Sequence, residues 1–146
     1  MADASDTTPG PTPETRQRIA AEVQHFLRIT LTKMGLEVEV SERPDPEELV
    51  FEVHGEDAGL AIGKKGATLD ALQLLCGRIA SKFPGGGKVP VTLDAQGYRA
   101  RRERTLTEMA ERLGEQAVHR GQVITLDPLN ARERRVVHMV YRIFRA

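Results

Sequence analysis

At 146 residues the chain is one domain or two very small ones, and its 40% of hydrophobic residues is enough for a core. One cysteine, Cys76, excludes an internal disulfide, and no apolar run approaches the roughly 18 residues that a membrane-spanning helix needs. The formal net charge is zero, but residues 1–60 carry 13 acidic and 5 basic side chains (net −8), whereas residues 61–146 carry 8 and 16 (net +8), which indicates a polyanionic partner for the basic part.

The first 13 residues are polar and proline-rich without hydrophobic periodicity, which predicts a disordered tail. They have neither the basic nor the apolar region of a signal peptide, so we expect a cytoplasmic protein that does not insert into a membrane. A helix is predicted over 14–34, followed by a stop at Gly35. Its apolar positions recur at helical spacing: Ile19, Val23, Phe26, Leu27, Leu31 and Met34.

Two short strands are predicted next. Residues 36–40 alternate apolar and charged side chains, which is typical of a half-buried strand, and residues 49–53 form the returning strand after a turn at 43–46. Asp57 is suited to cap a short helix over 58–62 that ends at Gly63.

The segment Ile62-Gly63-Lys64-Lys65-Gly66 has the Gly-x-x-Gly spacing of the KH-domain loop, which clamps the backbone of about four single-stranded nucleotides. A helix begins immediately after it, so we expect unpaired N–H groups and two lysine charges at a helix start, a combination that binds phosphate. By itself such a spacing is more often an ordinary turn into a helix.

The helix after the loop is predicted over 67–83, with a buried stripe of Leu69, Leu72, Leu75, Cys76, Ile79 and Phe83. A third strand is predicted over 89–93, and Pro90 indicates an edge position. The element order over 14–94 is α-β-β-α-α-β around the Gly-x-x-Gly loop. This is the order of the type II KH fold, an α+β fold in which helices pack on a three-stranded sheet.

A second, small α/β unit is predicted over 95–146. It comprises a helix over 95–118 with arginines in its first turns, a strand over 122–126, and a last helix. Asn130 caps that helix, with Glu133 at the third position as in a capping box. The apolar residues expected to be buried on the last helix are Val136, Val137, Val140 and Ile143.

On the last helix Arg134 and His138 are four residues apart and therefore share a face, which Arg142 and Arg145 continue, with Tyr141 beside them. Arginine guanidinium groups match phosphate oxygens, and a histidine beside them can donate a hydrogen bond to a phosphate or stack on a base. The alternative is an ordinary solvated helix face. A metal site is not expected, since no second histidine, cysteine or carboxylate cluster lies at ligand spacing.

The stretch from Leu126 to His138, with the Arg134 and His138 pair, resembles the signature of the Arg-x-x-x-His nucleic-acid-binding domain. Residues 66–73, after the loop, and 98–106, between the units, resemble the SpoIIIJ-associated (Jag) family, also called KhpB, over about residues 14–144. The resemblance implies a bacterial cytoplasmic RNA-binding protein that associates with a small stand-alone KH protein and influences cell division and envelope growth. It places the RNA-binding residues at Ile62, Gly63, Lys64, Lys65, Gly66, Arg134 and His138.

Two departures from the family pattern lead to further expectations. Longer family members carry an N-terminal Jag-N domain where this sequence has a short tail. The second domain of the family usually continues past its last helix into a turn and a closing strand, whereas this sequence stops at Ala146. We therefore expect the second sheet to lack a strand and to leave an exposed edge.

The sequence thus predicts a non-enzymatic protein that binds single-stranded RNA, with single-stranded DNA as a second candidate ligand, and needs no cofactor. The loop would grip the sugar-phosphate backbone, bases would lie near Ile62 and Leu69, and the last helix would hold a neighbouring phosphate. Two alternatives stay open. One is a protein-interaction module that contacts RNA incidentally, and the other is a small nuclease with His138 as general base.

Overall fold

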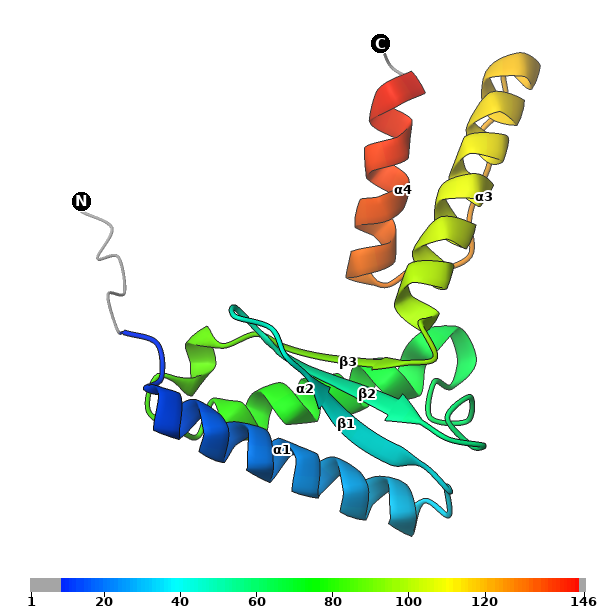
Figure 1. Cartoon of the computed structure of the whole chain (residues 1–146). Coiled ribbons are helices and arrows are strands. Elements are labelled where there is room, and N and C mark those ends of the chain that lie inside the picture. Colours follow the sequence, from blue (N-terminus) through cyan, green and yellow to red (C-terminus); the bar gives the residue numbers. More distant parts are fainter. Residues whose placement is uncertain (1–8, 145–146) are drawn as a thin grey trace, which may run out of the picture. The chain divides into compact units, whose positions relative to one another are not determined.

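The structure is a computed structural model that describes residues 9–144, so most of the tail predicted for residues 1–13 lies outside the described residues (Figure 1). The chain forms two compact units, one ending at Gln96 and one beginning at Gly97. No helix within residues 9–144 has both the length and the apolar character needed to cross a bilayer.

The first helix, α1, spans Pro13–Lys33, close to its predicted bounds. Thr12 caps it by accepting a hydrogen bond from the Thr15 amide at 3.2 Å, and Pro13 occupies the first turn, where no amide donor is needed. The buried face consists of Ile19, Ala20, Val23, Leu27 and Leu31. Met34, the last of the predicted apolar positions, lies beyond the helix and is 47% exposed.

The sheet has three strands in the order β1-β2-β3: β1 (Glu39–Arg43), β2 (Leu49–His54) and β3 (Val91–Ala95). β1 and β2 pair antiparallel with Val40 opposite Val53, and β2 and β3 pair parallel with Phe51 opposite Leu93. The edge position that Pro90 predicted for β3 is confirmed, and the Pro90 carbonyl accepts from the Leu49 amide at 2.9 Å.

β1 begins three residues later than the sequence predicted. The amide of Leu36 instead closes the end of α1 by donating to the Leu31 carbonyl at 3.1 Å. The amide of Glu37 donates to the Asp57 carboxylate at 2.7 Å. These backbone groups are therefore already paired outside the sheet.

The short helix predicted over 58–62 is instead a run of turns. Its backbone bonds join residues three apart, as between the Ile62 amide and the Gly59 carbonyl at 3.3 Å. Five residues are too few to offset the cost of starting a helix. In addition, the Asp57 side chain, which was expected to cap this helix, accepts from the Glu37 amide instead.

Helices α1 and α2 (Ala67–Ala80) pack against each other; α1 also packs on β1 and α2 on β3, so both cover one face of the sheet (Figure 1). The core between them contains Leu49, Phe51, Val53, Val91 and Leu93. This arrangement confirms the α+β class and the helix-packed three-stranded sheet. Leu75, which was predicted to be buried, is 48% exposed.

The second unit consists of α3 (Tyr98–Arg120), a connection without regular structure, and α4 (Ala131–Phe144). Its core is thin: Ala110, Val137 and Val140 are buried, with Leu126, Leu129 and Tyr141 packed around them. The strand predicted over 122–126 is wrong, since the described part of this unit offers no second strand to pair with it. Ile143 is 74% exposed and also falls outside the core.

Candidate nucleic-acid interface

The Gly63–Gly66 loop has a left-handed backbone at three positions. Gly63 (φ 73°), Lys65 (φ 54°) and Gly66 (φ 78°) all have positive φ. A Cβ on Gly63 would lie 2.8 Å from the Thr68 amide nitrogen, so the first glycine is needed for space as well as for its dihedral angles. The second glycine is buried and leads directly into α2.

Several loop amides are already bonded, contrary to the expectation of unpaired N–H groups. The Gly66 amide donates to the Gly63 carbonyl at 3.3 Å, the Ala67 amide to the Lys64 carbonyl, and the Leu69 amide to the Ile62 carbonyl at 3.1 Å. These bonds fix the shape of the loop. A phosphate here would therefore depend on the exposed side chains of Lys64 and Lys65 more than on these three amides.

Ile62 and Leu69 do not form the apolar groove expected beside the loop. Leu69 is fully buried and Ile62 is only 8% exposed, since both belong to the core. Ile62 acts on the loop through its carbonyl instead. The exposed large apolar side chain nearest in sequence is Leu60, at 66%, which the sequence did not single out because it lies in the segment expected to be a helix.

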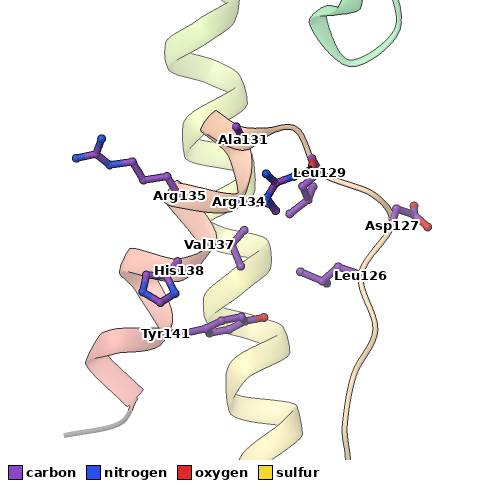
Figure 2. Close-up of a pocket in the computed structure, with 9 residues that line it drawn as sticks. All are labelled: Leu126, Asp127, Leu129, Ala131, Arg134, Arg135, Val137, His138 and Tyr141. Carbon is purple, nitrogen blue, oxygen red and sulfur yellow. Dashed lines mark hydrogen bonds between the residues drawn. The ribbon is translucent and has the colours of Figure 1, made fainter.

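Arg134 and His138 lie on α4, whose start is set by the predicted capping box. The Asn130 side chain accepts from the Glu133 amide at 2.9 Å, and the Glu133 carboxylate accepts from the Asn130 amide at 3.2 Å. Arg134 Nη1 donates to the Leu129 carbonyl at 3.0 Å, which directs the guanidinium toward the preceding connection (Figure 2). The predicted pair is therefore on a well-defined helix.

Both side chains line an open depression of about 770 Å³ between α4 and the connection before it (Figure 2). Arg134 and His138 are exposed, and the neighbouring wall is apolar, formed by Leu126, Leu129 and Val137. Asp127 is the acidic residue at its rim. The arrangement combines cationic groups with an apolar surface, which suits a nucleotide better than a free anion.

Two further arginines belong to this surface. Arg135 lines the same depression as Arg134, and Arg142 lines a second depression of about 990 Å³. Arg142 was predicted to lie on the stripe with Arg134 and His138, whereas Arg135 was not. The 3.6-residue period would have found Arg135, since it lies seven residues before Arg142 and so on the same face. Arg145 lies outside the described residues.

Arg102 is one of the arginines in the first turns of α3. Its Nε donates to Glu133 Oε1 at 2.8 Å. Glu133 is the one acidic residue of α4 and is only 6% exposed, so the pair is withdrawn from the surface. The exposed charge of α4 is therefore cationic.

Among residues 9–144 no group of three or more histidine, cysteine or carboxylate side chains is arranged to hold a metal ion. The candidate residues thus form one set in each unit: the two lysines of the loop in the first, and the arginines, His138 and the apolar wall beside α4 in the second.

Comparison with known proteins matches each unit to a family. The KhpA/KhpB KH-domain family matches residues 20–93, and the Arg-x-x-x-His domain family matches residues 104–145. The first match contains the Gly63–Gly66 loop, and the second contains Arg134 and His138. The two matches follow each other in the order that the sequence resemblance implied.

The chain is similar to curated proteins over more than half of its length. It is 39% identical to the "RNA-binding protein KhpB" of Bacillus subtilis over 88 residues, 60% of this chain and 42% of that protein. It is 32% identical to the protein of the same name from Clostridium symbiosum over 105 residues, 72% of this chain and 47% of that protein. The chain spans less than half the length of these relatives. With a KH domain followed by an Arg-x-x-x-His domain and these relatives, the chain belongs to the KhpB (Jag) family.

Proposed function

We propose that the chain binds single-stranded RNA, without catalysing a reaction on it, through the Gly63–Gly66 loop and the Arg134 and His138 pair. The observation that carries the proposal is that each matched domain presents exposed cationic side chains at its family motif: Lys64 and Lys65 in one, Arg134 in the other. The relatives from Bacillus subtilis and Clostridium symbiosum both carry the name RNA-binding protein.

At the loop, the side chains of Lys64 and Lys65 would hold the sugar-phosphate chain. The left-handed residues and the internal carbonyl bonds keep the loop in one shape, so little conformational entropy is lost when RNA binds. The buried Ile62 supports the loop rather than touching a base. Phosphate contacts carry no sequence information, so this part of the interface should accept many sequences.

On α4, the guanidinium of Arg134 would bind a phosphate, and the His138 ring would donate to a phosphate oxygen or stack on a base. All eleven basic residues of 97–146, histidines aside, are arginines, the residue whose planar group matches phosphate oxygens in pairs.

The family resemblance also suggests a location, a partner and a cellular process for this RNA binding. We propose a cytoplasmic protein that pairs with a small stand-alone KH protein and acts on transcripts linked to cell division and envelope growth. Single-stranded DNA remains a second candidate ligand, since the contacts proposed here are mostly to phosphates.

A charge-reversal experiment tests the proposal. Lys64→Asp with Lys65→Asp should abolish binding at the KH loop and so sharply weaken the affinity for a fluorescent single-stranded RNA, measured by polarisation. Arg134→Ala with His138→Ala should weaken it independently. Lys33→Asp with Lys82→Asp is the matched control, since it makes the same change in net charge at exposed positions away from both motifs.

Circular dichroism must show that each variant keeps its helices. RNA affinity that is unchanged in both motif variants, or equally reduced in the control, would contradict the proposal.

A further inference from the structure

Two depressions in the second unit meet at the same pair of side chains. His138 and Tyr141 line both the depression that contains Arg134 and Arg135 and the one that contains Arg142. In Figure 2 the Tyr141 ring extends from α4 toward the connection, below His138. A ligand that extends from one depression into the other must therefore pass these two rings.

We infer that Tyr141 is a platform on which a base of the RNA stacks, while phosphates on either side are held by Arg134 and Arg135 in one depression and by Arg142 in the other. This inference rests on the proposed RNA-binding function and adds to it a residue that contacts a base rather than the backbone.

The spacing of the arginines supports an RNA strand that runs along α4. Arg135 and Arg142 are seven residues apart, which is about two helical turns and roughly 10 Å along the axis, on the same exposed face. His138 lies between them, and α4 has no exposed acidic side chain. The path thus has an arginine at each end, with the His138 ring between them and the Tyr141 ring next to Arg142.

The environment of Tyr141 suits a stacking platform. Its side chain packs against the buried cluster of Ala110, Val137 and Val140, and it remains partly exposed. A ring that is already held in place loses little rotamer freedom when a base stacks on it. Among the described residues that line the two depressions, Tyr141 and His138 are the aromatic rings.

The composition of the chain allows a direct test. It has no tryptophan and two tyrosines, Tyr98 and Tyr141, so Tyr98→Phe leaves Tyr141 as its tyrosine fluorophore. In this variant, a single-stranded RNA oligonucleotide should quench the tyrosine emission as it binds. An abasic ribose-phosphate oligomer of the same length should bind without comparable quenching, because it has no base to stack.

Affinity gives a second readout. Tyr141→Leu keeps apolar bulk but removes the ring, and should weaken RNA binding about fivefold or more, whereas Tyr141→Phe should stay within about twofold. Binding of the abasic oligomer should be similar in both variants. The fluorescence measurement leaves position 141 unchanged, so it decides the matter even if Tyr141→Leu disturbs the thin core.

The outcomes separate the inference from the function on which it rests. If Arg134→Ala with His138→Ala weakens binding but RNA does not quench Tyr141, the stacking role is wrong and the RNA-binding function stands. If the unaltered chain does not bind the oligonucleotide at all, both are wrong. Equal quenching by the abasic oligomer would also overturn the stacking role.

Discussion

Arg102 and Glu133 join the two helices of the second unit through a hydrogen-bonded ion pair, with Arg102 Nε 2.8 Å from Glu133 Oε1. The same carboxylate accepts from the Asn130 amide through its other oxygen. Glu133 thus caps α4 and ties it to α3 at once. Arg134 is the next residue along the helix. The ion pair therefore fixes the position of Arg134, which is proposed to bind a phosphate.

Breaking this pair should destabilise the second unit. Glu133→Ala removes the carboxylate that accepts from the Asn130 amide at the start of α4. It also leaves Arg102, whose side chain is only 24% exposed, without its counter-charge. We therefore expect the free energy of unfolding to fall by about 3 kcal/mol. Urea unfolding followed by circular dichroism measures it.

The control for this prediction is Arg101→Ala, which removes an exposed arginine from the neighbouring position and should change the unfolding free energy by less than about 0.5 kcal/mol. A Glu133→Ala protein as stable as the parent would show that the pair is incidental. If the pair also positions Arg134, RNA affinity should fall in Glu133→Ala under conditions where the protein remains folded.

The first unit was largely predictable because local signals agree with its tertiary structure. The period of α1, the apolar residues of β2 and the proline before β3 each reflect a buried face or an edge that the fold provides. The start of β1 was not predictable, since it depends on the Asp57 side chain, twenty residues away, which binds the Glu37 amide. Such long-range bonds leave no periodic trace in the sequence.

The second unit shows where local signals fail. Residues 122–126 are rich in β-branched side chains, which favour a strand, but a strand needs a neighbour, and the described part of this unit provides none. At the candidate site, spacing alone singled out the Gly63–Gly66 loop and the Arg134 and His138 pair, whose binding role stays a prediction. Arg102 looked like one more surface arginine, because its partner Glu133 is 31 residues away and its burial is visible only in the folded chain.

The first glycine of the loop should be intolerant of any side chain. Gly63→Ala combines a positive φ of 73° with a Cβ 2.8 Å from the Thr68 nitrogen, so we expect a loss of roughly 2 kcal/mol or more in stability. Thermal or urea unfolding measures this loss, and RNA affinity should fall with it because the loop must change shape.

Gly77→Ala is the matched substitution within α2, where an added Cβ meets no atom within 4 Å. It should raise stability by about 0.5–1 kcal/mol, since alanine favours a helix. The two variants should therefore change stability in opposite directions. A neutral Gly63→Ala would mean that the loop can adopt another backbone without cost.

The salt dependence of RNA binding should report the number of phosphates that the protein neutralises. If the loop lysines and the α4 arginines together neutralise about three to five phosphates, log K should fall with log salt with a slope of roughly −2 to −3.5. Titrations at several potassium chloride concentrations measure the slope. Removing Arg134 should make it less negative by about 0.7, and a flat dependence would contradict phosphate contacts altogether.

The Cys76 thiol should be unreactive in the folded chain and should make stability fall at high pH. Its side chain is fully buried in α2, and that burial raises the pKa from 9.0 to about 12. The unfolded chain therefore releases this proton at a lower pH than the folded chain, so the thiol's contribution to stability is complete below pH 9 and is lost as the pH rises toward 12. Comparison with Cys76→Ala isolates the contribution of the thiol from that of the rest of the chain.

A thiol reagent at neutral pH should label Cys76 only at the rate at which α2 opens, and far faster in urea. Rapid labelling of the folded protein would show that this side of α2 is open to solvent.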